Sequence, residues 1–93
     1  MNKFLITFQT KTPEESSSVV GGIKDSGKEW ARINNWTYCI KSSLGKAADV
    51  RESILSCIKF DTRKNLKLYV VDVTESSWAT YGLPSEITTW IRT

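Results

Sequence analysis

Large apolar side chains alternate with other residues near the start of the chain. Phe4, Ile6 and Phe8 occupy every second position within residues 3–10. Successive side chains of a β-strand point to opposite faces of a sheet, so this two-residue period collects three bulky groups on one face. The pattern predicts that the chain starts with a strand whose one face joins the hydrophobic core.

A helix start follows this strand directly. Thr12 suits an N-cap, Pro13 the first helical position, and Glu15 is placed to complete a capping box. The residues that follow are rich in serine and glycine, which are weak helix formers, so a flexible linker is the alternative interpretation. Apolar residues nevertheless recur on one side, and Gly27 offers a stop. We therefore predict a helix that ends before Gly27.

The next segment has the composition of a β-hairpin. Trp30 and Ile33 lie before a pair of asparagines, and residues 36–40 favour β-structure. Asparagine tolerates positive φ better than other non-glycine residues, which suits a tight hairpin turn. We predict a hairpin with Asn34 and Asn35 as its two-residue turn.

The second half of the chain predicts a helix, a strand and a tail. Ser42 and Ser43 are candidate caps for a helix whose apolar stripe comprises Ala47, Val50, Ile54, Leu55 and Ile58. Residues 61–65 are polar and predict a simple connection. Residues 66–74 carry apolar side chains at both odd- and even-numbered positions. This pattern predicts a strand covered on both faces. A tail over residues 76–93 ends in a short helical pattern that we expect to pack as a lid.

The order strand, helix, hairpin, helix, strand and tail indicates the fold class. With 93 residues the chain can build one hydrophobic core. The most economical arrangement is an α+β, ferredoxin-like βαββαβ sandwich, with an antiparallel sheet and two helices on one face. We predict a single domain over residues 1–93, its tail packing on the domain or on a dimer partner.

The side chains available for catalysis argue against the familiar classes of enzyme. The chain has no histidine, which removes the commonest general base and the commonest zinc ligand. Its glycines lack the spacing of phosphate-binding motifs. Asp72 is the one aspartate within an expected core strand, and a charge at a sheet edge explains it better than a metal ligand does. We expect no catalytic residue, no metal and no cofactor.

Charge and cysteine content narrow the possible binding partners and the cellular compartment of the protein. A net charge of +3 permits nucleic-acid binding without indicating it. Cys39 and Cys57 lie in apolar runs without further metal-ligand residues nearby, so we expect both to be reduced and buried. No apolar run reaches the length of a signal core or membrane span, so we expect a cytoplasmic protein that does not bind membranes.

Two groups of residues are candidate binding surfaces. The cations Lys59, Arg63, Lys64 and Lys67 could neutralise phosphates or complement the carbonyls at a helix end, and we favour the second interpretation. Four tryptophans in so small a chain are hard to bury together. We therefore expect a subunit or partner interface at the C-terminal end that uses residues among Trp78, Tyr81 and Trp90.

Several segments carry a resemblance to known proteins. The strand over residues 3–10, the hairpin around Trp36-Thr37, and the ending from Trp78-Ala79 through Leu83-Pro84 to Trp90-Ile91 resemble short bacterial and phage SinR-like proteins. Those proteins are distantly similar to the ferredoxin-like small subunit of CRISPR adaptation and to VapD-type ribonucleases. The resemblance implies a homodimer built around the terminal strands.

The resemblance also bears on activity. The related nucleases carry an aspartate after the apolar core of the first strand, in a Tyr-Asp pair that holds a metal across the dimer. The matching pair here is Phe8-Gln9, and a neutral glutamine cannot balance a divalent cation as a carboxylate would. The resemblance therefore implies that nuclease activity is lost.

Two functions follow as hypotheses. The first is a non-catalytic, homodimeric interaction protein, of phage or mobile-element type, that binds a protein partner through its tryptophan-rich C-terminal surface. The alternative is a nucleic-acid-binding protein or residual metal-dependent ribonuclease that uses the four cations at the end of the second helix. Salt-sensitive binding would favour the alternative, because phosphate contacts release counterions.

Overall fold

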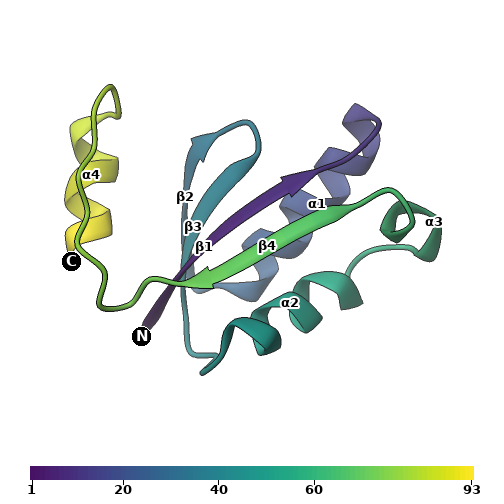
Figure 1. The fold of residues 1–93 in the computed structure, drawn as a ribbon, viewed down its shortest axis with the longest axis horizontal. Coiled ribbons are helices and arrows are strands. Elements are labelled where there is room, and N and C mark those ends of the chain that lie inside the picture. Colours follow the sequence, from purple (N-terminus) through teal and green to yellow (C-terminus); the bar gives the residue numbers. More distant parts are fainter.

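The chain forms a four-stranded antiparallel sheet with four helices, shown in Figure 1 as a computed structural model that describes residues 1–93. The elements in chain order are β1 (Asn2–Gln9), α1 (Pro13–Ser26), β2 (Glu29–Asn34), β3 (Thr37–Ser42), α2 (Ala47–Ser56), α3 (Phe60–Arg63), β4 (Lys67–Asp72) and α4 (Ser85–Arg92). The strand order is β2-β3-β1-β4. This arrangement confirms the predicted ferredoxin-like fold. None of its helices has the length and apolar character needed to cross a membrane.

The start of α1 is the predicted capping box. The backbone N–H of Glu15 donates to Thr12 Oγ1 at 3.2 Å, and the Thr12 N–H donates to Glu15 Oε1 at 3.2 Å. The helix prediction is confirmed over the linker alternative. Gly27 follows the helix with φ of −123°, so positive φ is not what requires glycine there. A Cβ at this position would lie 2.8 Å from Ile40 Cβ, so a side chain would collide with β3.

The core lies between the sheet and the layer formed by α1 and α2 (Figure 1). Phe4, Ile6 and Phe8 of β1 are buried on this face, as their two-residue period predicts. The core cluster is completed by Val19, Ile23, Tyr38, Ile40, Val50, Ile54 and Ile58. The apolar residues of two strands, β1 and β3, and of two amphipathic helices thus meet in a single cluster.

The hairpin forms, but not with the predicted turn. Asn34 ends β2, and the turn residues are Asn35 and Trp36. No non-glycine residue has positive φ. The register shifts between Arg32 and Asn34, and the Trp36 N–H donates to Asn34 Oδ1 at 2.9 Å. An irregular strand end and a side-chain hydrogen bond therefore replace the left-handed turn expected of an asparagine pair.

The caps predicted for the second helix are wrong. Ser42 belongs to β3, and its hydroxyl donates to the Ser26 carbonyl at 2.8 Å. The N-cap of α2 is Lys46, which makes no side-chain capping bond. Part of the connection predicted at residues 61–65 is instead helical, in α3. Cys57, which we expected to be buried, is exposed at the end of α2, whereas Cys39 is buried.

The prediction of a fully covered β4 is also wrong. Strand β4 lies at the edge of the sheet, and Leu68 and Val70 pack against the core. Tyr69 and Val71 point to the other face and are 71% and 48% exposed. A strand covered on two faces and an edge strand with one bare face can have the same run of apolar residues. The sequence therefore could not distinguish the two kinds of strand.

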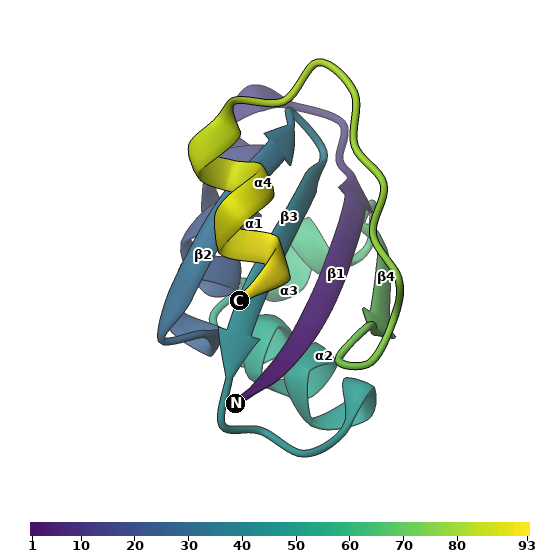
Figure 2. The ribbon, with the colours of Figure 1, turned by 90° about the vertical axis from the view of Figure 1, so that its left-hand side faces the viewer.

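The C-terminal tail lies on the sheet face opposite α1 and α2 (Figure 2). Ile91 of α4 is completely buried. Lys3 Nζ donates to the Ile91 carbonyl at 2.7 Å, and Lys41 Nζ donates to Thr93 Oγ1 at 2.8 Å. Lys41 Nζ also lies 4.5 Å from the centre of the Trp90 ring. Two cations thus hold the C-terminal end of α4, where carbonyl groups carry partial negative charge.

Candidate functional site

The three aromatic residues predicted for a partner surface have different environments. Tyr81 is fully exposed. Trp78 is half-buried, and its indole N–H is buried without a hydrogen-bond partner. Trp90 donates from Nε1 to Glu29 Oε1 at 2.8 Å and stacks with Lys41. The structure brings Trp78 and Tyr81 together at one apolar pocket that also includes Leu5. Trp90 instead anchors the tail to the sheet.

Of the four cations predicted as a basic cluster, Arg63 alone bonds to carbonyl groups at the end of a helix. Arg63 donates from Nε to the Ile58 carbonyl at 3.0 Å, and its guanidinium also contacts the Leu55 carbonyl. Lys64 Nζ lies 3.8 Å from Asp61 Oδ1 and 5.2 Å from the centre of the Phe60 ring. Lys59 and Lys67 are exposed and make no ion pair. Arg63 therefore supports the helix-end interpretation.

The acidic residues do not gather into a metal site. No group of three or more His, Cys, Asp or Glu side chains lies close enough to hold a metal ion. Asp72 is exposed at the end of β4, where the Thr74 hydroxyl donates to Oδ1 at 2.5 Å and the Thr74 N–H at 3.0 Å. These hydrogen bonds hold the pKa of Asp72 below its ordinary value. Gln9 is exposed and pairs with Lys67 in the sheet.

The two cysteines differ in chemistry as well as in burial. Cys39 lies on the tail-covered face of β3, and burial raises the pKa of its thiol to about 11. The nearby cations Lys3 and Lys41 act in the opposite direction and offset only part of this shift. A thiol that stays protonated is a weak nucleophile, so Cys39 has the properties of a packing residue.

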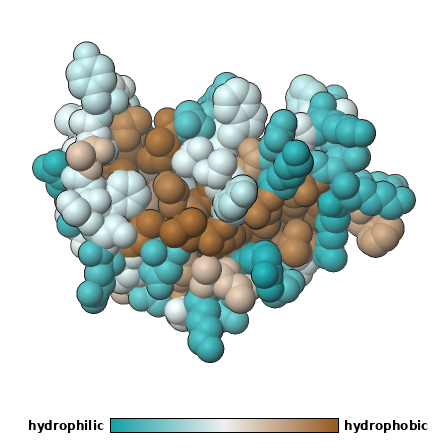
Figure 3. All heavy atoms as spheres, in the orientation of Figure 1, coloured by the Kyte–Doolittle hydropathy of each residue, from teal (hydrophilic) through white to brown (hydrophobic).

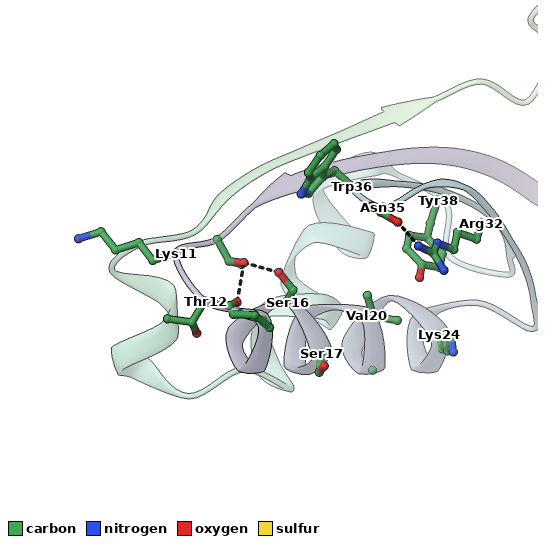
Figure 4. Close-up of a pocket in the computed structure, with 13 residues that line it drawn as sticks. Lys11, Thr12, Ser16, Ser17, Val20, Lys24, Arg32, Asn35, Trp36 and Tyr38 are labelled. Atoms are coloured by element: carbon green, nitrogen blue, oxygen red, sulfur yellow. Dashed lines mark hydrogen bonds between the residues drawn. The ribbon is translucent and has the colours of Figure 1, made fainter.

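The structure reveals a groove that we did not predict. It lies between α1 and the β2–β3 hairpin and has a volume of about 740 Å³ (Figure 4). Lys11, Lys24 and Arg32 line it, together with Trp36 and Tyr38. These residues come from separate elements, so no motif marks them. The available signal was a lysine just before a capped helix and another in its last turn, together with aromatic residues near a hairpin tip.

One solved crystal structure has a fold similar to that of this chain. The crystal structure of Streptococcus pyogenes Cas2 at pH 6.5 aligns with a TM-score of 0.52 over 98% of this chain and 96% of that chain, at 16% sequence identity. No family model and no curated protein matches the chain. The finding supports the likeness to the CRISPR adaptation small subunit at the level of fold. The SinR-like and VapD-type parts of the resemblance remain predictions.

Proposed function

We propose that the protein is a non-catalytic, homodimeric interaction module that pairs through the edge of β4 and contacts a protein partner through Tyr81. The observation that carries the dimer is the bare face of β4. Tyr69 and Val71 expose apolar surface beside a row of unpaired backbone groups, a combination that favours pairing with another strand.

The edge of β4 is a better dimer edge than the edge of β2. Strand β2 has a register irregularity and carries Glu29 and Arg32, and such features discourage pairing between edges. Strand β4 is regular, with an apolar centre. Figure 3 shows hydrophobic atoms reaching the surface across the middle of the molecule, where β1 and β4 run in Figure 1.

A two-fold axis restricts the register of such a pair. A two-fold axis perpendicular to the sheet extends it in antiparallel fashion and keeps each face continuous. Odd-numbered residues of one β4 strand therefore lie opposite odd-numbered residues of the other, and even-numbered opposite even-numbered. With the axis at Val70, Tyr69 of each subunit faces Val71 of the other. Aromatic and β-branched residues form favourable cross-strand pairs. This register brings the exposed apolar side chains of both subunits together.

Tyr81 is the candidate contact for a protein partner. It is fully exposed and lies near the half-buried Trp78 at one end of the tail-covered face. An exposed aromatic side chain supplies a large contact area at low entropic cost, which is why tyrosine is common among the residues that dominate binding energy. Trp90 is assigned to tail packing in this proposal rather than to the partner surface.

The proposed lack of catalysis rests on the residues present. The neutral Gln9 occupies the position where the resembling nucleases carry a metal-binding aspartate, and no histidine is available as a base. A phage or mobile-element setting, and a CRISPR-associated role suggested by the shared fold, are parts of the same proposal. Both depend on the identity of the partner.

The dimer can be tested by measuring mass in solution. We expect sedimentation or light scattering to give twice the chain mass of 10.5 kDa for the unmodified protein. The double variant Tyr69→Lys with Val71→Lys should be monomeric, because each new lysine faces one of the partner. Phe60→Lys is the control, since Phe60 is 71% exposed on α3.

Different outcomes separate the parts of this proposal. A monomeric unmodified protein, or a double variant that remains dimeric, would exclude the β4 interface. For the partner surface, Tyr81→Ala should abolish capture of the protein that the unmodified chain retains in a pull-down, while Phe60→Ala should not. Retained binding by Tyr81→Ala would remove Tyr81 from the partner surface.

A further inference from the structure

The groove between α1 and the β2–β3 hairpin has the charge of an anion-binding site. Lys11, Lys24 and Arg32 line it, and no aspartate or glutamate does. The two ion pairs of the chain, Arg51–Glu52 and Lys64–Asp61, lie elsewhere. The three cations therefore have no carboxylate partner. Within the chain, Lys24 Nζ lies 4.2 Å from the centre of the Trp30 ring, and Arg32 contacts the Asn35 side chain.

Tyr38 contributes a polar group that the protein itself does not use. Its side chain lines the groove and is only 5% exposed, yet its hydroxyl makes no hydrogen bond within the chain. The ring is fixed by contacts with Phe8 and Trp30, at centroid distances of 6.4 Å and 6.2 Å. The one buried side-chain polar atom without a partner is Trp78 Nε1, so the Tyr38 hydroxyl is open to the groove, where it can donate to solvent or to a ligand.

Trp36 provides an aromatic surface beside these cations. Its backbone is held by two hydrogen bonds, from the Phe8 N–H to the Trp36 carbonyl at 2.9 Å and from the Trp36 N–H to Asn34 Oδ1 at 2.9 Å. The side chain is nevertheless 56% exposed. Figure 4 shows the indole above the groove, with Lys11 toward one end and Lys24 and Arg32 toward the other. A fixed backbone with an open ring favours stacking of a planar group.

The spacing of the cations indicates the length of the ligand. The helical residues from 13 to 24 span about 16 Å at the rise of an α-helix. Lys11 and Lys24 therefore lie far enough apart to contact different phosphates of one strand. A ligand that uses both must carry several negative charges along an extended backbone.

We propose that this groove binds single-stranded nucleic acid, with phosphates at Lys11, Lys24 and Arg32, a base stacked on Trp36, and the Tyr38 hydroxyl as a donor to the strand. A basic groove with an exposed aromatic ring is the usual means of binding single strands without sequence preference. The site is distinct from the cluster of Lys59, Lys64 and Lys67. It also does not depend on the proposed β4 interface, so either proposal can fail alone.

The experiment measures binding of a fluorescently labelled single strand of about twelve nucleotides, a length within the usual site sizes. We expect affinity to fall roughly 20-fold between 50 and 200 mM salt, because three phosphate contacts in a single strand give a logarithmic slope of about −2. RNA and DNA strands are compared, with a duplex and a mononucleotide as competitors.

Matched variants test the groove itself. The triple variant Lys11→Gln, Lys24→Gln and Arg32→Gln should remove most binding and flatten the salt dependence. The control triple Lys59→Gln, Lys64→Gln and Lys67→Gln removes the same charge and should bind nearly as the unmodified protein does. All six residues are exposed, so the fold is expected to persist, which circular dichroism verifies.

Two single variants separate stacking from charge. Trp36→Ala should weaken binding roughly 5- to 100-fold, as expected for loss of one stacked base. Tyr38→Phe keeps the packed ring and removes only the hydroxyl, and it should weaken binding roughly 3- to 10-fold. Phe60→Ala, which removes an exposed aromatic elsewhere, should have no effect.

The proposal is overturned if no strand binds at low salt, or if the control triple weakens binding as much as the groove triple. Equal competition by a mononucleotide would overturn the extended path between Lys11 and Lys24. Preferential binding of the duplex, unaffected by Trp36→Ala, would overturn the stacking of an unpaired base.

Discussion

The two faces of the sheet are covered in different ways. On one face, ten buried residues of the sheet, α1, α2 and the segment that follows α2 form a continuous hydrophobic cluster. On the other, the tail contributes one fully buried aliphatic residue, Ile91, and is held by Lys3 and Lys41. The first face is an ordinary core, whereas the second combines a small apolar contact with hydrogen bonds from cations.

The unfolding free energy of the protein is therefore distributed unevenly between the two faces of the sheet. Apolar burial contributes free energy in proportion to area, so the helix-covered face should account for most of the unfolding free energy. The tail-covered face has fewer apolar contacts and should open before the domain unfolds. It also leaves Tyr69 and Val71 bare, which is where we propose that a second subunit binds.

The largest expected effect comes from the helix-covered face. Phe4→Ala should lower the free energy of unfolding by about 3–5 kcal/mol, because it leaves a cavity among completely buried neighbours. Urea denaturation followed by circular dichroism measures the change. Thr7→Ala, on the exposed face of the same strand, should change stability by less than about 1 kcal/mol. Similar losses for both variants would contradict this assignment of the core.

Ile91→Ala should have the next largest effect, about 2–3 kcal/mol, confined to the tail. We expect the tail to detach while α1 and α2 remain folded. Cys39 would then react with a thiol reagent faster than in the unmodified protein, whereas the exposed Cys57 would react rapidly in both. If Cys39 stays protected while the whole domain loses stability, the two faces form a single cooperative unit.

The Cys39 thiol predicts a pH dependence of the tail-covered face. Its pKa is raised in the folded state from 9.0 to about 11, so the folded protein keeps a proton that the unfolded chain loses. This contribution to stability is fully present below pH 9 and is lost as the pH rises through 11. The loss is on the order of 2 kcal/mol. Denaturation midpoints measured from pH 7 to pH 11 should fall less steeply in Cys39→Ala.

Lys3→Met should have the smallest effect, about 1 kcal/mol, because it removes a cation and a hydrogen bond from the end of α4. The effect should shrink at high salt. Lys28→Met is a suitable control, since Lys28 is exposed and its side chain makes no hydrogen bond or ion pair. Thermal denaturation at low and high salt compares the two. An equal shift for both variants would show that Lys3 acts only through net charge.

Several features were predictable because they depend on neighbours along the chain. The alternation of Phe4, Ile6 and Phe8 and the capping box of Thr12 and Glu15 follow from backbone geometry over a few residues. The apolar stripe of α2 follows likewise from helical spacing. The predictions were wrong where a short segment could adopt two different local conformations. The asparagine pair could form a tight turn, yet an irregular strand end removes the need for positive φ.

The candidate sites were less predictable for the same reason. Arg63 was correctly placed at a helix end, since such a role depends on residues close in sequence. The exposed face of β4 depends instead on which strand lies at the sheet edge. The groove needs Lys24, Arg32 and Trp36, which α1 and the hairpin bring together only after they pack.

Local sequence patterns were enough to predict the four strands, the helices α1, α2 and α4 and their order, but not α3, because periodicity and capping act over a few residues. No such local pattern indicates that the tail covers the opposite face of the sheet, that Lys41 is buried under it, or that the β4 edge is open. These outcomes depend on contacts between distant segments. Their free energies come from area, charge and geometry that exist only once the sheet has formed.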